Sequence, residues 1–191
     1  MHLDELSEKL WTLIPFDQTQ SLALFEMAQE RLQKRQFRQA GLAAIQNVND
    51  SSLQIRNDEI FWLDAKSDDL SKAEKDFLSF IENLREEIKN DFRVSLSEFE
   101  CHFAFYDKGH YYQKHRDTTA LNNKRVFSFV LYLNEDWKES DGGHLIGYDQ
   151  DKVIFRVKPE LGQMILFRSD LEHEVMPTQR GRFSLTGWFR K

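Results

Sequence analysis

Two histidines and one aspartate have the residue types and the spacing that suit a site for a single iron ion. His115 and Asp117 are two residues apart, so in an extended segment both side chains point to the same side and can converge on one ion. His173, on a later strand-like segment, would supply a third ligand. Two histidines and one carboxylate leave positions open on Fe(II), enough for a chelating 2-oxo acid and dioxygen. A His-x-Asp pair alone more often lies in a solvated loop, so the prediction depends on all three residues.

The other histidines are weaker candidates for metal ligands. His102 shares one face of a predicted strand with Tyr106, so it could approach the site without binding the metal. His110 and His144 lie in turn-like segments, and we expect both to be exposed to solvent.

Arg182 and Tyr132 are candidates for binding a carboxylate. The last predicted strand has a polar face formed by Arg182, Ser184, Thr186 and Trp188. An arginine stays charged when buried, and its planar guanidinium can bind a carboxylate through two hydrogen bonds. Burying such a face unpaired costs roughly 1 to 3 kcal/mol per polar group, so it implies a ligand, water or exposure. Tyr132 could donate its hydroxyl to the same carboxylate. The alternation of side chains along the strand, taken alone, favours an exposed edge-strand arginine at position 182 and a core tyrosine at position 132.

The first half of the chain, which must support these residues, is predicted to be mainly helical. Apolar residues recur at helical spacing in residues 3–13 and again in residues 19–32, whereas residues 59–63 are typical of a short strand. A third helix, capped by Ser67 and Asp68, is predicted from the apolar stripe Leu70, Ala73, Phe77, Ile81, Leu84 and Ile88.

Beyond Phe92 the apolar period changes from 3.6 to 2 residues. Strand-like runs separated by glycine, proline and aspartate turns occupy residues 99–105, 126–133, 153–157, 164–167 and 182–189. Many short strands with such spacing predict a sandwich or barrel, so we expect an α+β fold with a jelly-roll core. Helical support and a substrate loop are assigned to residues 1–95, and the jelly-roll core to residues 96–191.

Length and composition indicate one domain and narrow the partners. The chain has 191 residues, 40% of them hydrophobic, which is enough for one substantial core and short for two. Its net charge of -6 provides no overall positive field, so nucleic acid is a disfavoured partner. The single cysteine, Cys101, fits a reducing compartment. We find no signal-peptide pattern and no apolar run long enough to span a bilayer, and therefore expect a cytoplasmic protein with no membrane partner.

Several segments together resemble the prolyl 4-hydroxylase family of Fe(II) and 2-oxoglutarate dependent dioxygenases, in particular bacterial and animal relatives of the hypoxia-sensing prolyl hydroxylases. The matching segments are QIRNDEIFWLD, FYDKGHYYQKHRD, KRVFSFVLYLNEDW, DGGHL, LGQMILFRSDLEHEVMP and GRFSLTGWF. The resemblance covers most of the chain. It implies a double-stranded β-helix, the jelly-roll fold, buttressed by N-terminal helices.

The resemblance also implies roles for individual residues. The positions that match the iron ligands are His115, Asp117 and His173. Arg182 and Tyr132 match the residues that bind the distal carboxylate of 2-oxoglutarate. Tyr106 matches a tyrosine near the other end of the co-substrate, and Thr186 a polar residue beside it. The aromatic residues that would line the pocket are Tyr112 and Trp188. The positions that match a mobile loop over a peptide substrate, and a basic residue that can pair with it, are Arg56, Asp58 and Arg125. Without the resemblance, Arg56 and Asp58 would be read as a solvated charge pair.

The activity implied by the resemblance is hydroxylation of a prolyl residue in a protein. Dioxygen is the oxidant, 2-oxoglutarate is converted to succinate and carbon dioxide, and a reductant such as ascorbate can assist. Bacterial relatives act on elongation factor Tu, so we rank that protein first as the substrate. Free proline, another side chain or another protein remain open.

Two alternatives belong to other functional classes. A nucleic-acid demethylase of the AlkB type would use the same iron and co-substrate, but such enzymes resemble one another in a second arginine six residues after the first, where this chain has Trp188. A non-enzymatic jelly-roll module would bind or sense a metal. Arg182 argues against the module, because a structural metal site has no use for a group that binds a co-substrate.

Overall fold

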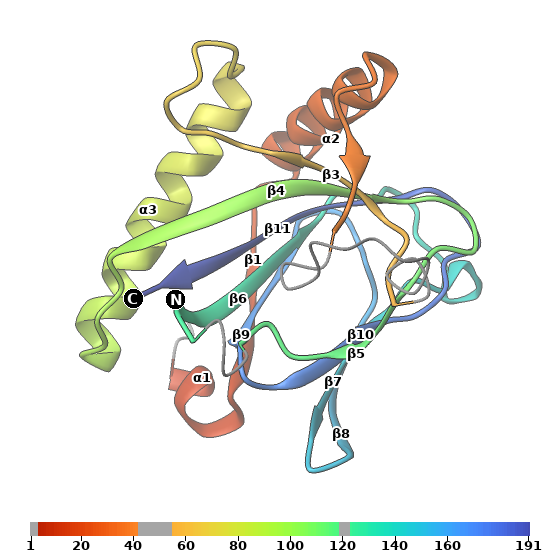
Figure 1. The fold of residues 1–191 in the computed structure, drawn as a ribbon. Coiled ribbons are helices and arrows are strands. Elements are labelled where there is room, and N and C mark those ends of the chain that lie inside the picture. Colours follow the sequence, from red (N-terminus) through yellow and green to blue (C-terminus); the bar gives the residue numbers. More distant parts are fainter. Residues whose placement is uncertain (1–3, 42–54, 119–122) are drawn as a thin grey trace.

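The computed structural model describes residues 4–41, 55–118 and 123–191, and within them two antiparallel sheets face each other (Figure 1). The larger sheet has the order β1 (Trp11–Pro15), β9 (Gln163–Arg168), β6 (Arg125–Tyr132), β11 (Arg182–Arg190), β4 (Glu98–Tyr106), β3 (Glu59–Trp62) and β2 (Arg38–Gln39). The smaller sheet has the order β5 (Tyr112–His115), β10 (Glu172–Val175), β7 (Leu145–Asp149) and β8 (Lys152–Val157). This architecture confirms the predicted α+β jelly roll.

Helices cover the outer face of the larger sheet (Figure 1). They are α2 (Gln18–Gln33) and α3 (Lys72–Phe92), whereas the short helix α1 (Asp4–Lys9) lies at the end of β1. A 3-10 turn, η1, spans Glu139–Asp141. One apolar cluster lies between α2, α3 and this sheet, and a second lies between the two sheets. The site described below opens from the space between the sheets.

The third helix has the predicted apolar stripe but not the predicted cap. It begins after Ser71, whose hydroxyl accepts the backbone N–H of Glu74 while the Glu74 carboxylate accepts the backbone N–H of Ser71. The same carboxylate forms a buried ion pair with Arg31 of α2, with 2.6 Å between Nε and Oε1. A cap at Ser67 and Asp68 was therefore wrong, because the link to α2 and the reciprocal cap both fix the start at Ser71.

The first predicted helix is shorter than its leucine spacing indicates. The helix α1 ends at Lys9, Leu10 adopts a positive φ of 68°, and Trp11–Pro15 pairs with β9 at the edge of the larger sheet. Sheet pairing satisfies the backbone groups of this segment and buries Ile14, which outweighs the local helical pattern. The described part of the N-terminal half therefore supplies the strands β1, β2 and β3 as well as helices. That residues 1–191 form a single domain stays a prediction.

Strand β11 separates the apolar core from the cavity. Phe183, Leu185 and Phe189 belong to the cluster beneath the helices, whereas Arg182, Thr186 and Trp188 line the cavity between the sheets. This alternation follows the predicted parity. Within the described ranges, no helix is both long and apolar enough to cross a membrane.

Replacing Gly187 by alanine tests how tightly β11 packs. A Cβ at this position would lie 2.5 Å from the backbone oxygen of Glu100 and 2.3 Å from the ring of Phe129. We expect Gly187→Ala to lower the free energy of unfolding by about 1 to 3 kcal/mol, because backbone cannot yield to the added methyl. Urea denaturation measures this, with Gly41→Ala as the control, since nothing lies within 4 Å of that position. Equal losses in both variants would contradict the packing described here.

Candidate metal centre and co-substrate pocket

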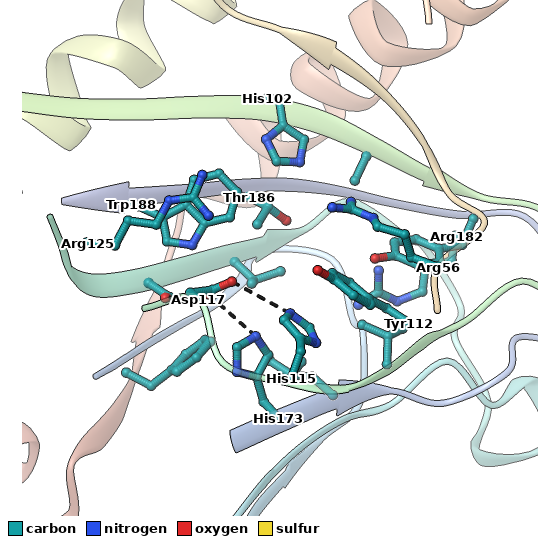
Figure 2. A pocket seen from close by; sticks show the side chains of 17 residues that line it. Arg56, His102, Tyr112, His115, Asp117, Arg125, His173, Arg182, Thr186 and Trp188 are labelled. Carbon is teal, nitrogen blue, oxygen red and sulfur yellow. Dashed lines mark hydrogen bonds and ion pairs between the residues drawn. The ribbon is translucent and has the colours of Figure 1, made fainter. Parts of the chain in front are cut away.

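The three predicted metal ligands come together in the structure. His115 on β5 lies opposite His173 on β10 in the sheet register, and Asp117 follows two residues after His115. The Asp117 carboxylate oxygens are 3.6 Å from His115 Nε2 and 3.4 Å from His173 Nε2. All three ligand atoms lie within 4.8 Å of one another, and Figure 2 shows the side chains converging. One cation can therefore be reached by all three.

Both imidazoles are held in the tautomer that a metal requires. His115 Nδ1 lies 2.8 Å from the backbone oxygen of Gln113, and His173 Nδ1 lies 3.0 Å from that of Leu171. A carbonyl oxygen can only accept, so each Nδ1 carries the proton and each Nε2 keeps its lone pair. These lone pairs face the Asp117 carboxylate, and the backbone thus orients both rings for a cation.

Two serines that the sequence analysis missed hold Asp117 in place. The Ser128 hydroxyl donates to Asp117 Oδ2 at 2.7 Å and lies 2.9 Å from the Ser169 hydroxyl. The backbone N–H of Asp117 also donates to the Ser169 carbonyl at 3.1 Å. Ser128 did carry a signal, since it is a serine between the apolar residues Phe127 and Phe129 and has the same parity as Tyr132.

The protonation states favour a bound cation. Burial alone would raise the pKa of Asp117, but His173, His115 and the Ser128 hydrogen bond outweigh it and hold that pKa well below its ordinary value. Burial, with the neighbouring His115, lowers the pKa of His173 to about 4. At neutral pH the centre therefore offers a carboxylate and a neutral imidazole, which are the forms that bind metals.

Arg182 is a buried cation at the other end of the cavity. Its side chain is 1% exposed, and no carboxylate of the described residues forms an ion pair with it. Its Nε donates to the backbone oxygen of Gly143 at 2.9 Å. Because a buried charge is costly when unpaired, this position suits an anionic ligand such as a carboxylate.

Tyr132 and Tyr106 flank this guanidinium. Their ring centroids lie 5.2 Å and 4.9 Å from the Arg182 Cζ atom, respectively. The Tyr132 hydroxyl is buried and lacks a hydrogen-bond partner in the described part of the chain. A carboxylate held by Arg182 would supply that partner, so the residues present fit 2-oxoglutarate.

Gly143 is required beside Arg182. It has a positive φ of 65°, and a Cβ there would lie 3.0 Å from Arg182 Cδ. His144, the next residue, is buried rather than exposed as predicted, and its Nε2 lies 3.1 Å from the Glu139 carboxylate of η1. His110 is half-buried, not exposed.

The cavity joins the two ends, and the space not filled by atoms is about 560 Å³ when the open solvent at its mouth is included. The predicted residues that line it are Arg56, Tyr106, Tyr112, His115, Asp117, Arg125, His173, Arg182, Thr186 and Trp188. Tyr132 and Asp58, which were also predicted, are not among the lining residues. Tyr112 stacks on the His115 ring, with centroids 3.5 Å apart, so an aromatic wall adjoins the metal ligands.

Unlike Arg182, the arginines Arg56 and Arg125 at the cavity each have an ion-pair partner, but not in both cases the predicted one. Arg56 forms an ion pair with the fully buried Asp58 at 2.6 Å, so this pair is not the solvated one that the simplest interpretation predicts. Arg125 was expected to pair with the segment around Arg56. In the described residues its ion-pair partner is instead Glu100, at 2.9 Å, and its guanidinium lies 3.5 Å from the Trp188 ring centroid. Residues 42–54, which precede Arg56, are outside the described part.

Comparison with known proteins decides the family. Residues 101–190 match the model of the 2OG-Fe(II) oxygenase superfamily. The structure also matches a crystal structure of a Pseudomonas putida prolyl-4-hydroxylase with a TM-score of 0.88 and 34% identity, over 99% of this chain and 97% of that one. The chain belongs to the 2OG-Fe(II) oxygenase superfamily. This oxygenase is thus an enzyme that uses Fe(II), 2-oxoglutarate and dioxygen.

Two further relatives of the oxygenase come from animals. A Trichoplax adhaerens prolyl hydroxylase in complex with a hypoxia inducible factor peptide fragment has a TM-score of 0.86 at 24% identity, over 98% of this chain and 86% of that one. A hypoxia-inducible factor prolyl hydroxylase of Caenorhabditis elegans is 30% identical over 143 residues. These cover 71% of this chain and 20% of that protein. The chain spans less than half the length of the curated relatives it matches.

Removing the Ser128 hydroxyl tests the support of the metal ligand. We expect Ser128→Ala to weaken Fe(II) binding about tenfold, because the hydroxyl orients the Asp117 carboxylate and groups in this role are typically worth 10- to 100-fold. Anaerobic Fe(II) titration measures the affinity. The exposed helix residue Ser79, replaced by alanine, is the control. An unchanged affinity in Ser128→Ala would show that Asp117 does not bind the metal through this arrangement.

Removing the Tyr132 hydroxyl tests the co-substrate end. We expect Tyr132→Phe to raise the dissociation constant of 2-oxoglutarate about tenfold, the effect of one lost hydrogen bond of roughly 1.4 kcal/mol. Stability should hardly change, because the hydroxyl has no partner among the described residues. Tyr148→Phe, a change outside the cavity, is the control. Equal affinity of the wild type and Tyr132→Phe for 2-oxoglutarate would refute the assignment.

Proposed function

We propose that this oxygenase hydroxylates a prolyl residue of a protein at the 4-position. The observation that carries the proposal is the likeness, at 34% identity and over nearly the whole of both chains, to a structure described as a prolyl-4-hydroxylase. The fit of His115, Asp117 and His173 to one cation, and of Arg182 to a carboxylate, supports the oxygenase chemistry that this reaction needs.

Each group of residues has a distinct task in the proposed reaction. His115, Asp117 and His173 hold Fe(II). Arg182 and Tyr132 bind the distal carboxylate of 2-oxoglutarate, and Tyr106 contacts the co-substrate nearer its other end, with Thr186 beside it. Bound Fe(II), with 2-oxoglutarate and dioxygen, supplies the oxidising power that converts a C–H bond to C–OH, and succinate and carbon dioxide are the other products.

The substrate side favours a peptide over a nucleic acid. Arg56 and Arg125 are the arginines of the cavity wall beyond Arg182, and Asp58 and Glu100 already neutralise them. A nucleic acid would need unpaired cations for its phosphates. We infer that Arg56 and Asp58 belong to a segment that closes over the peptide, with Tyr112 and Trp188 as aromatic walls.

The substrate protein is proposed from the resemblance to bacterial prolyl hydroxylases. Elongation factor Tu ranks first, in keeping with a cytoplasmic enzyme, and a reductant such as ascorbate can maintain Fe(II). The printed descriptions of the animal relatives concern hypoxia inducible factor, but this chain spans a fifth of the Caenorhabditis elegans protein. Its own substrate therefore has to be identified directly.

Incubation with host lysate tests the proposed function. We expect mass spectrometry to find one added oxygen on a proline of a lysate protein, present only when Fe(II) and 2-oxoglutarate are both supplied. Arg182→Ala is the matched variant and should lose the modification at limiting 2-oxoglutarate. Oxygen transfer to nucleobases, or modification independent of the co-substrate, would refute prolyl hydroxylation.

A further inference from the structure

His102 lies in the wall of the cavity and has no hydrogen-bond partner among the residues that the structure describes. Its side chain is 2% exposed, and its Nδ1 is buried and unpaired among the described residues. Its other ring nitrogen, Nε2, likewise has no hydrogen-bond partner among the described residues. A buried polar group without a partner lowers stability, so folded proteins retain few of them. The ring nitrogens of His102 are therefore available to a ligand.

The sheet register places His102 at the level of the metal centre. On β4, the residue opposite Arg182 is Tyr106, and His102 lies four residues further along, roughly 13 Å away at 3.3 Å per residue. This is farther than a five-carbon dicarboxylate held by Arg182 extends.

The neighbouring strand β11 links the level of His102 to the level of the metal ligands. His102 is opposite Thr186 on β11, and the next inward residue, Trp188, is opposite Ser128, which binds Asp117. Figure 2 shows His102 on β4, across the cavity from His115 and His173. This is the side from which a substrate would face the metal.

Aromatic rings connect this position to the surface. The His102 ring centroid lies 4.7 Å from that of Trp62 and 5.4 Å from that of Trp188. Trp62 is 46% exposed, whereas Trp188 is buried and its indole N–H also lacks a partner in the described segments. The rings of Trp62, His102 and Trp188 thus form a wall that extends from the solvent to the level of the metal ligands. Its buried end carries unpaired nitrogens of His102 and Trp188 among the described residues.

We propose that His102 positions the substrate by donating a hydrogen bond to a backbone carbonyl of the bound peptide beside the target residue. This inference rests on the proposed function, because it needs a peptide substrate. A prolyl residue has no backbone N–H, so the peptide unit at its nitrogen offers only an acceptor, and the wall must supply a donor.

The state of the ring agrees with this role. Burial, with the nearby cation Arg56, lowers the pKa of His102 to about 3, so the imidazole is neutral. A neutral imidazole has one N–H to donate and does not add a charge beside the metal. The nitrogen of a glutamine amide can occupy the place of Nε2, whereas leucine removes both nitrogens at similar volume.

The test compares His102→Leu and His102→Gln with the wild-type enzyme. The probe is a synthetic peptide with the sequence of the site hydroxylated in the lysate. We expect His102→Leu to raise the KM for this peptide about tenfold, as one lost hydrogen bond does, and to form more succinate per hydroxylated peptide. His102→Gln should restore most of both losses. The control is His110→Leu, because His110 also has a buried unpaired Nδ1 but does not line the cavity.

Thermal unfolding separates positioning from a structural role. With Fe(II) and 2-oxoglutarate bound, His102→Leu should unfold at a temperature no lower than the wild type, since it removes an unpaired buried group. An unchanged peptide KM in His102→Leu, or a lower unfolding temperature with no rescue by glutamine, would overturn the inference. If the lysate peptide carries its oxygen on a residue other than proline, prolyl hydroxylation fails as the function, while the KM comparison on that peptide still decides the role of His102.

Discussion

The two-faced strand β11 is the constraint on which the rest of the structure depends. Phe183 and Leu185 face the core beneath the helices, and Arg182 and Thr186 face the cavity. Hydrogen-bonded neighbours on both sides, β4 and β6, fix its register. A slip of one residue would bury the guanidinium among phenylalanines, at a cost of several kcal/mol for an uncompensated charge. The alternation that folds the sheet is thus the alternation that builds the pocket.

The cavity holds polar groups ready for ligands at the expense of stability. Arg182 lacks an anion, the Tyr132 hydroxyl lacks an acceptor or donor, and the Nε2 atoms of His115 and His173 face Asp117 alone, all within the described residues. Metal and co-substrate would provide the missing partners, so binding and stability are coupled. Backbone carbonyls on each Nδ1 and the Ser128 hydroxyl keep the ligands oriented in advance, which lowers the entropy lost on binding.

The sequence allowed prediction of features that depend on local period and residue type. The period of 2 placed Arg182 on the inward face of its strand, and the apolar stripe located the third helix. The sequence could not show that pairing with β9 would make the residues after Leu10 a strand. It also could not show that the ion pair between Glu74 and Arg31 would help to fix the start of the third helix at Ser71. The burial of His144 and the support of Asp117 by Ser128 likewise depend on contacts between segments distant in the chain. The specific assignments of site residues stay predictions until ligand binding is measured.

Anaerobic titration with Fe(II) and then 2-oxoglutarate tests the central claim most directly. If His115, Asp117 and His173 leave two positions for the chelating co-substrate, a metal-to-ligand charge-transfer band should appear on adding 2-oxoglutarate to the iron-loaded protein. The band should be absent in Asp117→Ala and should need a higher 2-oxoglutarate concentration in Arg182→Ala. Bound iron without a band at saturating 2-oxoglutarate would contradict the account and favour a metal-binding module without enzymatic activity.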